Sequence, residues 1–493
     1  MDLHVLILAH LDSYDILQTR KTCKILHDAT LQRIVWIEAL RQQCRKNNIY
    51  EATFPLSKMS LSDLEHAATV PSRWASLSSK PRKDENPLPN FITRRLHCPQ
   101  RIAYDLEEEL GEFSSFYLVP GGRYLVTFSW NWIAIWDLGQ KPGPDTITDF
   151  QPLGVSALHF TGMSLVHPSP DGRGLRIFVS AAEQTLIKQD CYESSVFLIY
   201  EIYPQSVNPK LELIARLSPI TTHDISFYSL SYNRLIFLEG SVLKIWDYKQ
   251  HSWASWTVEQ DYDQIIVGES TITLLCHTGV SVWPIPALST SSPPFSNPFP
   301  PTATPHVTLS YPSPSPADTT WCVGPCDWFS GTTLPFLYDL VSWESKSQTV
   351  KMRRYEVVLS QDLKSSELIE RRTFTFHGPD ESDLLIQPSA FYEDSLVSLF
   401  YDATSNSIKL HTGSVLASSP QDKDNELAPE SEARDTITLV KGEQITTGHA
   451  IGFCPISARL LYLDSENNIC ILDYVPRPAK EVSHSFRSIC PGT

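Results

Sequence analysis

The sequence lacks the features that mark several large classes of protein. No uninterrupted apolar stretch reaches the roughly 18 residues that a membrane-spanning helix needs, so no membrane partner is expected. The apolar start, MDLHVLILAHLD, is short and has no basic region of the kind that opens a signal peptide. Charged residues make up only 19% of the chain, but hydrophobic residues reach 42%, which excludes wholesale disorder and a collagen-like or fibrous chain.

Signatures of catalysis and metal binding are also missing. There is no HExxH, no G-x-S-x-G, no Walker loop and no paired CxxC. Cys322 and Cys326 lie close together, but their spacing is poor for zinc and no second pair follows, which favours a structural role. Cys23, Cys276 and Cys470 lie in apolar runs, where free cysteine packs as a small hydrophobe. We therefore expect reduced thiols in a cytoplasmic or nuclear protein, with no metal, no cofactor and no enzyme activity of its own.

Two other groups of polar residues have ordinary interpretations. His167 and Asp171, in HPSPDGRG, resemble an inter-strand turn rather than a catalytic pair. The doublets 353–354 and 371–372, both Arg-Arg, could bind a phosphate or a carboxylate. Solvated strand faces with one side chain in and one out are the favoured interpretation.

Negative charge is concentrated in the body of the chain. Residues 1–104 hold 15 Lys and Arg against 10 Asp and Glu, whereas the remaining residues hold 25 against 46. Nucleic acids and anionic membranes need clustered Lys and Arg, so an acidic body argues against both as partners.

The head of the chain, up to about residue 70, has helical periodicity. Apolar residues recur at three- and four-residue steps in 3–11, 14–30 and 31–44, which predicts three short helices, with Asp12-Ser13 able to cap the second. Capping-box spacing at 62–65 opens a further helix, which should stop near residue 70 because a proline follows. Residues 75–92 read as a polar linker.

From about residue 104 onward, the sequence repeats a strand, a tight polar turn and a second strand that ends in an aromatic residue or Leu followed by an acid. The clearest copies are 124–138, 234–248, 272–285 and 460–474, with looser copies at 194–203 and 395–412. The unit aligns on Trp136, Tyr200, Trp246, Trp283 and Leu472. A degenerate repeat of roughly 40 to 60 residues with two clear strands per unit is typical of a β-propeller.

Two insertions interrupt this repeat. Residues 286–318 are rich in Pro, Ser and Thr and are expected to form an extended, poorly ordered loop. Residues 418–435 are mostly acidic and are expected to be solvated. Without both insertions the body has room for about seven blades of roughly 45 residues, with six and eight as open alternatives. The predicted fold is therefore mainly β, a degenerate propeller over 104–476 followed by a tail at 477–493, with a small α-helical head.

The head resembles an F-box, the helical motif that docks on the Skp adaptor of a cullin-RING ubiquitin ligase. Leu11-Asp12, followed by DIL at 15–17, corresponds to the family's L-D-x-x-D-L-L, TCK at 22–24 stands where the family has V-C-R, and Val35-Trp36 matches its late hydrophobe-Trp. The family's opening Leu-Pro, which contributes to adaptor contact, is not in the sequence. We expect either that the given sequence starts after those two residues or that this F-box is a weakened one. Leu26 stands where the family often carries Trp.

The resemblance is strong over residues 2–45 and only architectural beyond them. A helical segment and linker at 46–103 followed by a propeller also looks like the F-box proteins of mushroom-forming fungi (basidiomycetes). It implies a substrate receptor of an SCF-type ubiquitin ligase complex, in which the head binds the Skp adaptor, and through it a cullin, while the propeller binds an unknown protein target. The residues implied in adaptor binding, as an exposed apolar patch, are Leu3, Leu6, Leu11, Ile16, Leu17, Cys23 and Trp36.

Two alternatives stay open at this point. The propeller could be a scaffold for protein–protein interaction that is independent of any ligase, with the head folded onto it. It could also be a propeller enzyme, which would need inward-pointing His, Asp and Glu from several blades, whereas the strand sequences are mostly apolar and aromatic.

Overall fold

The computed structural model describes most of the helical head and the strands of the body. The described residues are 3–78, 86–89, 92–98, 112–139, 151–182, 194–221, 225–258, 262–276, 278–290, 303–311, 319–323, 328, 336–344, 347, 349–360, 366–377, 395–402, 405–414, 431–432, 436–442 and 450–475. The predicted tail at 477–493 and Cys326 lie outside this set, as does most of the acidic insertion. No helix among the described residues is long and apolar enough to cross a membrane.

The head contains more helices than the three predicted for its first 46 residues. They are α1 (Leu3–Leu8), α2 (Ser13–Thr19), α3 (Lys24–Thr30) and α4 (Arg33–Lys46), followed by the short 3-10 helix η1 (Glu51–Thr53) and α5 (Leu61–Ser78). Asp12 caps α2 as predicted, its carboxylate accepting a 2.8 Å hydrogen bond from the Asp15 N–H. The single helix predicted over 14–30 is wrong, because Cys23 takes an extended conformation that separates α2 from α3.

The last helix of the head begins earlier and ends later than its sequence pattern predicts. The capping box is formed by Ser60 and Asp63, which exchange two 3.2 Å hydrogen bonds between side chain and backbone. The helix also continues through Pro71, although an internal proline costs about 3 kcal/mol. Packing explains the continuation, because Trp74 beyond the proline lies 5.1 Å from the ring of Phe453 and 5.7 Å from that of Tyr474.

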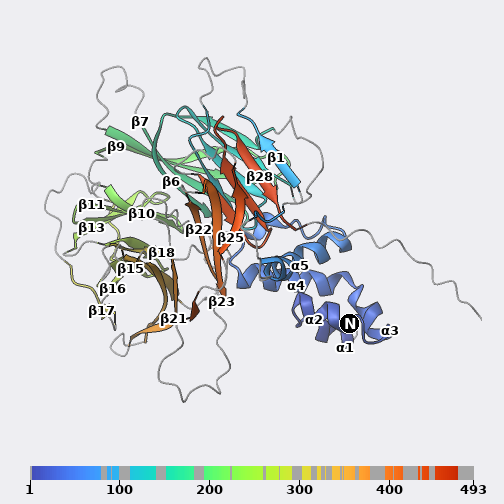
Figure 1. Ribbon diagram of the computed structural model, residues 1–493. Helices are drawn as coiled ribbons and strands as arrows, with labels where there is room; N and C mark the ends of the chain where they lie inside the picture. The colour runs from blue at the N-terminus through green and yellow to red at the C-terminus, as the bar shows by residue number, and fades with distance from the viewer. Residues whose placement is uncertain are drawn as a thin grey trace, which may run out of the picture.

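The described strands of the body form seven sheets, which we call blades 1 to 7 in ring order (Figure 1). Blade 1 is β2 (Ser115–Leu118), β3 (Tyr124–Phe128), β4 (Trp132–Asp137) and β5 (Gly154–Ala157); blade 2 is β6 (Phe160–Pro168), β7 (Leu175–Ala182), β8 (Ser194–Ile202) and β9 (Glu212–Thr221); blade 3 is β10 (Ile225–Ser231), β11 (Arg234–Glu239), β12 (Val242–Asp247) and β13 (Ser252–Thr257); blade 4 is β14 (Gln264–Val267), β15 (Thr271–Cys276), β16 (Gly279–Pro284) and β17 (Val307–Ser310). Blade 5 is β18 (Thr319–Val323), β19 (Phe336–Glu344), β20 (Thr349–Val358), β21 (Glu367–His377) and β24 (Ser431–Glu432); blade 6 is β22 (Ser395–Asp402), β23 (Ser407–Ser414) and β25 (Thr436–Lys441); blade 7 is β26 (Ile451–Cys454), β27 (Arg459–Leu463), β28 (Ile469–Asp473) and β1 (Ile92–Leu96).

The blades close into a ring. Apolar clusters join blades 1 and 2, 2 and 3, 3 and 4, 4 and 5, 6 and 7, and 7 and 1, while β24 pairs with β21 next to blade 6. The fold is therefore mainly β, with seven propeller blades among the described residues and a helical head before them, in agreement with the prediction of about seven blades. The helices lie to one side of the propeller, with α4 and α5 nearest the blades and α1 to α3 farther away (Figure 1).

The repeated sequence unit corresponds to the second and third strands of a blade. All five aligned residues lie on third strands, namely Trp136 on β4, Tyr200 on β8, Trp246 on β12, Trp283 on β16 and Leu472 on β28. In three blades, the acidic residue that follows the aligned residue pairs with an arginine at the start of the second strand. The sequence analysis missed this partner. These pairs are Arg123–Asp137 at 2.6 Å, Arg176–Glu201 at 2.7 Å and Arg459–Asp473 at 2.6 Å.

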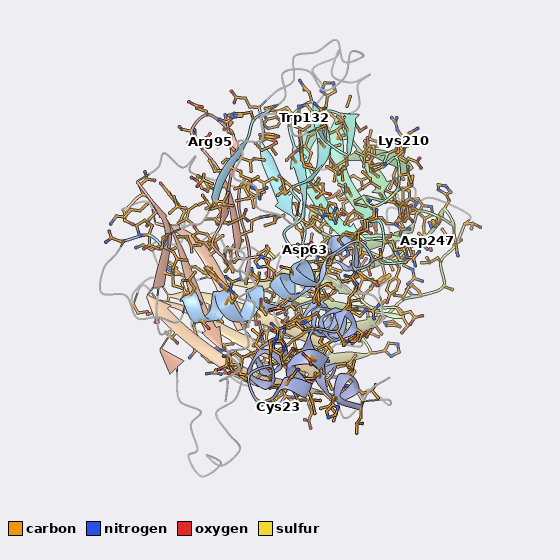
Figure 2. The ribbon with its side chains drawn as sticks, turned by 90° about the vertical axis from the view of Figure 1, so that its right-hand side faces the viewer. Cys23, Asp63, Arg95, Trp132, Lys210 and Asp247 are labelled. Atoms are coloured by element: carbon orange, nitrogen blue, oxygen red, sulfur yellow. The ribbon has the colours of Figure 1, made fainter. Side chains whose placement is uncertain are left out.

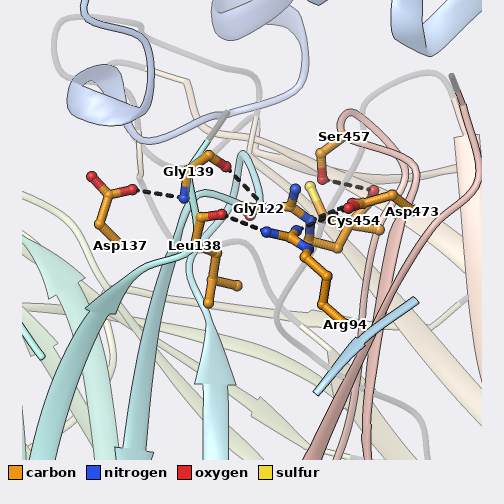
Figure 3. A network of polar contacts seen from close by, with 9 residues as sticks. Arg94, Gly122, Asp137, Leu138, Gly139, Cys454, Ser457 and Asp473 are labelled. Atoms are coloured by element: carbon orange, nitrogen blue, oxygen red, sulfur yellow. Dashed lines mark hydrogen bonds and ion pairs between the residues drawn. The ribbon is translucent and has the colours of Figure 1, made fainter. Parts of the chain in front are cut away.

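Strand β1 lies inside the stretch predicted to be a linker, and it closes the ring. It pairs antiparallel with β28 and so completes blade 7, which makes the sheet region begin at Ile92 rather than near residue 104. Arg94, which gives this segment a polar appearance, is 2% exposed because it donates to Asp473 at 2.9 Å and to the Leu138 carbonyl of blade 1 at 2.8 Å (Figure 3).

Two other expectations about the body are wrong. The insertion at 286–318 contains a strand, β17, which pairs with β16 through the alternating apolar residues Val307 and Leu309. Arg353 and Arg354 are both buried rather than one in and one out, because the Arg354 guanidinium binds the Asp339 carboxylate at 2.8 and 2.9 Å. Arg371 of the second doublet is exposed and pairs with Glu356.

Candidate functional site

The helical head carries apolar side chains that the described residues leave exposed. Leu3 is 66% exposed and Ile25 is 64% exposed, far beyond what a packed helix face allows. Together these exposed side chains lie on or next to α1, α2 and α3: Leu3, Leu6, Ile7, Tyr14, Ile25 and Leu31. We call this set the head surface. Six exposed large apolar side chains within the first 31 residues favour an interaction site.

The structure separates the predicted adaptor-binding residues into three groups. Leu3, Leu6 and Cys23 are exposed, whereas Leu11 and Leu17 are half-buried against the core of the head. The expectation that Ile16 and Trp36 contribute to the exposed patch is wrong, because both are fully buried. Their part in adaptor binding stays a prediction, now as residues that hold the shape of the head.

Sequence reasoning missed four members of the head surface. Ile7, Tyr14, Ile25 and Leu31 lie within the apolar stripes that predicted the helices, and periodicity alone assigns such residues to a core. The signal that could have found them is the excess of apolar positions on each short helix, which exceeds what one helix can bury.

A buried network fixes the centre of the head. The indole N–H of Trp36 donates to the Thr30 carbonyl at 2.8 Å, and the guanidinium of Arg20 lies 5.4 Å from the indole ring. Arg20 also makes two hydrogen bonds of 2.9 and 2.8 Å to the carboxylate of Glu65 on α5. A bidentate pair of this kind adds geometric precision, so the helices that carry the head surface are held in register with α5.

The segment after α4 attaches the head to the propeller. Burial raises the pKa of Tyr50, so its hydroxyl stays protonated and donates to the Arg173 carbonyl of blade 2 at 2.6 Å. The Thr53 hydroxyl donates to the Pro120 carbonyl of blade 1 at 3.2 Å. Gly121 has a φ of +106°, and a Cβ there would collide with the Thr53 side chain, so this turn needs glycine.

A tryptophan from blade 5 completes this junction across the ring. Trp328 is 2% exposed, and its ring lies 6.0 Å from those of Tyr50 and Tyr117 and 6.2 Å from that of His167. The backbone N–H of Trp328 donates to the Asn48 side-chain oxygen at 2.8 Å. Trp328 lies between β18 and β19 in the sequence, so residues of three blades and the head meet at one indole.

These contacts place the head on one edge of the blades. Pro120, Arg173 and Trp328 all lie between the first and second strands of their blades. We call this the head edge. Because the strands are antiparallel, the turns between second and third strands lie on the other side, which we call the opposite edge. The opposite edge is therefore not covered by the helical head.

The comparisons with known proteins bear on the head. Residues 1–38 match the F-box domain. The F-box stretch therefore ends inside α4 and contains every residue of the head surface. No curated protein sequence matches the chain.

Two solved structures resemble the body of the chain. The WD40 domain of SCAP from fission yeast is 12% identical, with 74% of this chain and 85% of that one covered and a TM-score of 0.36. The C-terminal WD40 domain of Sif2 is 9% identical, with 79% and 99% covered and a TM-score of 0.40.

Polar groups between α5 and the propeller bind one another. A cavity of about 60 Å³ lies between α5 and blades 1 and 7. Arg123 and Arg459 line it, but their donors are directed to Asp137, Asp473 and the Thr53 carbonyl. Among the described residues, no cluster of three His, Cys, Asp or Glu side chains could hold a metal ion. The absence of a cofactor and of enzyme activity stays a prediction.

Acid should weaken the junction through His167. Burial against Trp328 lowers the pKa of His167 to about 4, whereas an unfolded histidine titrates near 6.5. The unfolded chain therefore binds more protons than the folded chain as pH falls from about 6.5 to 4, and up to about 3 kcal/mol of stability is lost over that window. The measurement is the urea midpoint as a function of pH. His167→Phe keeps a ring against Trp328 and should lose less stability over the same window; an identical pH profile would contradict the prediction.

Proposed function

We propose that this chain is the substrate-recognition subunit of an SCF-type cullin-RING ubiquitin ligase. The F-box helices bind a Skp-family adaptor and through it a cullin, and the propeller binds a protein target. The observation that carries the proposal is the head surface, a set of exposed apolar side chains within the F-box stretch. These side chains belong to the part of the chain that forms α1 to α3, the helices that lie farthest from the blades (Figure 1).

The energetics support a partner for this surface. Full burial of one Leu or Ile side chain contributes about 1.5 to 3 kcal/mol, so covering Leu3, Ile7 and Ile25 alone would supply a large part of a stable interface. Association costs free energy, because each partner loses translational and rotational freedom. An exposed aromatic residue such as Tyr14 can contribute more binding energy than its buried area alone suggests.

In this proposal the chain performs no bond chemistry. Ubiquitin transfer belongs to other subunits, and this chain contributes proximity by holding lysines of the target near the loaded conjugating enzyme. The junction at Tyr50 and Trp328 suits this role, because a rigid connection keeps the target at a constant distance from the adaptor. We place the protein in the cytoplasm or nucleus, and among F-box proteins of the basidiomycete type.

The test is capture of the tagged full chain by purified Skp adaptor. The double variant Leu3→Asp, Ile7→Asp puts charge on the head surface without touching the buried core, and it should reduce adaptor binding at least about a hundredfold. The matched control is Leu213→Asp on β9 of the propeller, which is 49% exposed and should bind normally.

Failure of the unaltered chain to bind the adaptor would overturn the proposal. The propeller would then be best explained as a scaffold for protein–protein interaction that is independent of a ligase. Equal binding by the double variant and the unaltered chain would also contradict it, because the head surface would then not be the contact.

A further inference from the structure

An exposed tryptophan lies on the opposite edge of the propeller. Trp130 is 64% exposed in the short turn between β3 and β4 of blade 1. Trp132 and Trp136, on the strand that follows, are fully buried. The exposure of Trp130 therefore has no explanation in the packing of its own blade, and tryptophan is the residue most enriched at the energetic centres of interfaces.

The turn that carries Trp130 is held rigidly. The Trp130 carbonyl accepts a 2.8 Å hydrogen bond from the Phe160 N–H, and the Asn131 carbonyl accepts one of 3.0 Å from the Leu158 N–H. The Ser129 N–H closes the turn on the Trp132 carbonyl at 2.9 Å. Because the backbone is fixed from blade 2 as well as blade 1, the backbone of this turn has little conformational entropy left to lose on binding.

The position of Trp130 is remote from the F-box helices. The turn between second and third strands lies on the opposite edge of blade 1, whereas Pro120 on the head edge contacts the head. Figure 2 shows the adjacent Trp132 at the far end of the molecule from Cys23 of the F-box stretch. A partner on Trp130 and an adaptor on the head surface can therefore bind at the same time.

Two carboxylates lie on the same rim of the propeller as this turn. Ser115 pairs with Phe128 and the Ser114 N–H donates to the Phe128 carbonyl, so the register carries Glu112 to the level of the 129–131 turn. The Asn467 side chain, in the corresponding turn of blade 7, donates to the Glu112 carboxylate and brings the exposed Glu466 to the same rim.

The exposed cation Arg95 is also on this rim, and it lies 3.9 Å from the Asp464 carboxylate. The rim therefore combines an aromatic face with excess negative charge, in a body whose Asp and Glu outnumber its Lys and Arg by 46 to 25.

We propose that Trp130, Glu112 and Glu466 form the docking surface for a basic segment of the protein target. A Lys or Arg side chain lies over the indole face, where the ring quadrupole attracts a cation, and neighbouring cations of the segment meet the two carboxylates. This inference rests on the proposed function for the identity of the partner as a ligase target. It goes further by specifying the chemistry of that target as cationic.

The experiment uses the full chain labelled with 5-fluorotryptophan, with Trp130→Phe identifying the Trp130 signal in the fluorine NMR spectrum. The probes are the hexapeptide GRKRKG, its acidic counterpart GEDEDG and its apolar counterpart GLLLLG. The basic peptide should shift the Trp130 signal. Trp130→Ala should weaken its binding at least about tenfold, and Glu112→Gln with Glu466→Gln about three- to tenfold, with the loss diminishing at high salt.

The matched control is Glu344→Gln, which removes one exposed carboxylate near the turn between second and third strands of blade 5 and should leave the Trp130 shift unchanged. Equal shifts with the acidic or apolar peptide would overturn the proposed chemistry, as would basic-peptide binding that survives Trp130→Ala. Adaptor capture by Trp130→Ala distinguishes the two proposals. If this variant loses the peptide but still binds the adaptor, the docking surface on the propeller is tested independently of the head.

Discussion

Replacing Asp473 by asparagine should destabilise the protein by about 3 to 5 kcal/mol, because it leaves two buried guanidinium groups without their shared carboxylate. Asp473 accepts from Arg459 at 2.6 Å and from Arg94 at 2.9 Å. Burial by itself would raise the pKa of Asp473, but Arg459 and Arg94 together hold it below the usual range. Burial and the nearby Arg459 lower the pKa of Arg94 to about 10, so removal of the carboxylate worsens an already costly environment.

The loss should be largest at the ring closure, where this network lies. Arg94 belongs to β1 and joins blade 7 to the Leu138 carbonyl of blade 1, while Arg459 reaches the Gly139 carbonyl at 3.4 Å (Figure 3). We expect a lower urea midpoint and faster amide hydrogen exchange in β1 and β28 than in blade 3.

The control for this prediction replaces the whole charged group. The triple variant Arg94→Met, Asp473→Leu, Arg459→Met removes both signs of charge, and it should be more stable than Asp473→Asn alone. If the free energy of unfolding of Asp473→Asn, measured with urea, is within about 0.5 kcal/mol of that of the unaltered protein, the network does not hold the ring closed.

Trp328→Ala should cost about 3 to 5 kcal/mol and loosen the F-box head from the propeller. The substitution empties the site where Tyr50 of the head, Tyr117 of blade 1 and His167 of blade 2 meet one indole. Urea unfolding measures the stability. Limited proteolysis within residues 47–60 measures the release of the head, and cleavage there should accelerate at least tenfold.

Trp130→Ala is the matched control, because it removes an exposed tryptophan side chain instead of a buried one. Trp130 is 64% exposed, whereas Trp328 is 2% exposed, so Trp130→Ala should change stability by less than about 0.5 kcal/mol. Similar losses from both substitutions, or unchanged proteolysis in Trp328→Ala, would contradict a coupling role for Trp328.

A rigid junction has a consequence for the proposed ligase role. With the F-box helices on the head edge and Trp130 on the opposite edge, the body of the propeller separates adaptor from target. If Trp328→Ala lets the head move, adaptor binding through Leu3 and Ile7 should persist, while the geometry that places target lysines is lost.

Local patterns in the sequence predicted a helical head and the second and third strands of several blades. Trp136, Trp246 and Leu472 mark third strands because a strand that packs between neighbouring blades needs apolar residues on both faces and a turn after it, and both signals are local. The match between residues 1–38 and the F-box domain likewise follows from short-range order and spacing.

The candidate site was predictable only in part. Leu3 and Leu6 were identified and are exposed, but Ile16 and Trp36 are buried because other helices of the head pack over them. Periodicity finds the apolar residues of a helix, and it does not say which of them a neighbouring helix will cover.

What the sequence by itself determined is the order of the parts: a helical head, a linker, and a degenerate repeat of about seven units, with negative charge in the body. Only the tertiary structure decided that Arg94 closes the ring on Asp473 and that Trp328 reaches the head. The physical reason is separation along the chain. Arg94 and Asp473 are 379 residues apart, and Asn48 and Trp328 are 280 apart, so their contacts depend on how seven blades close into a ring rather than on any local pattern.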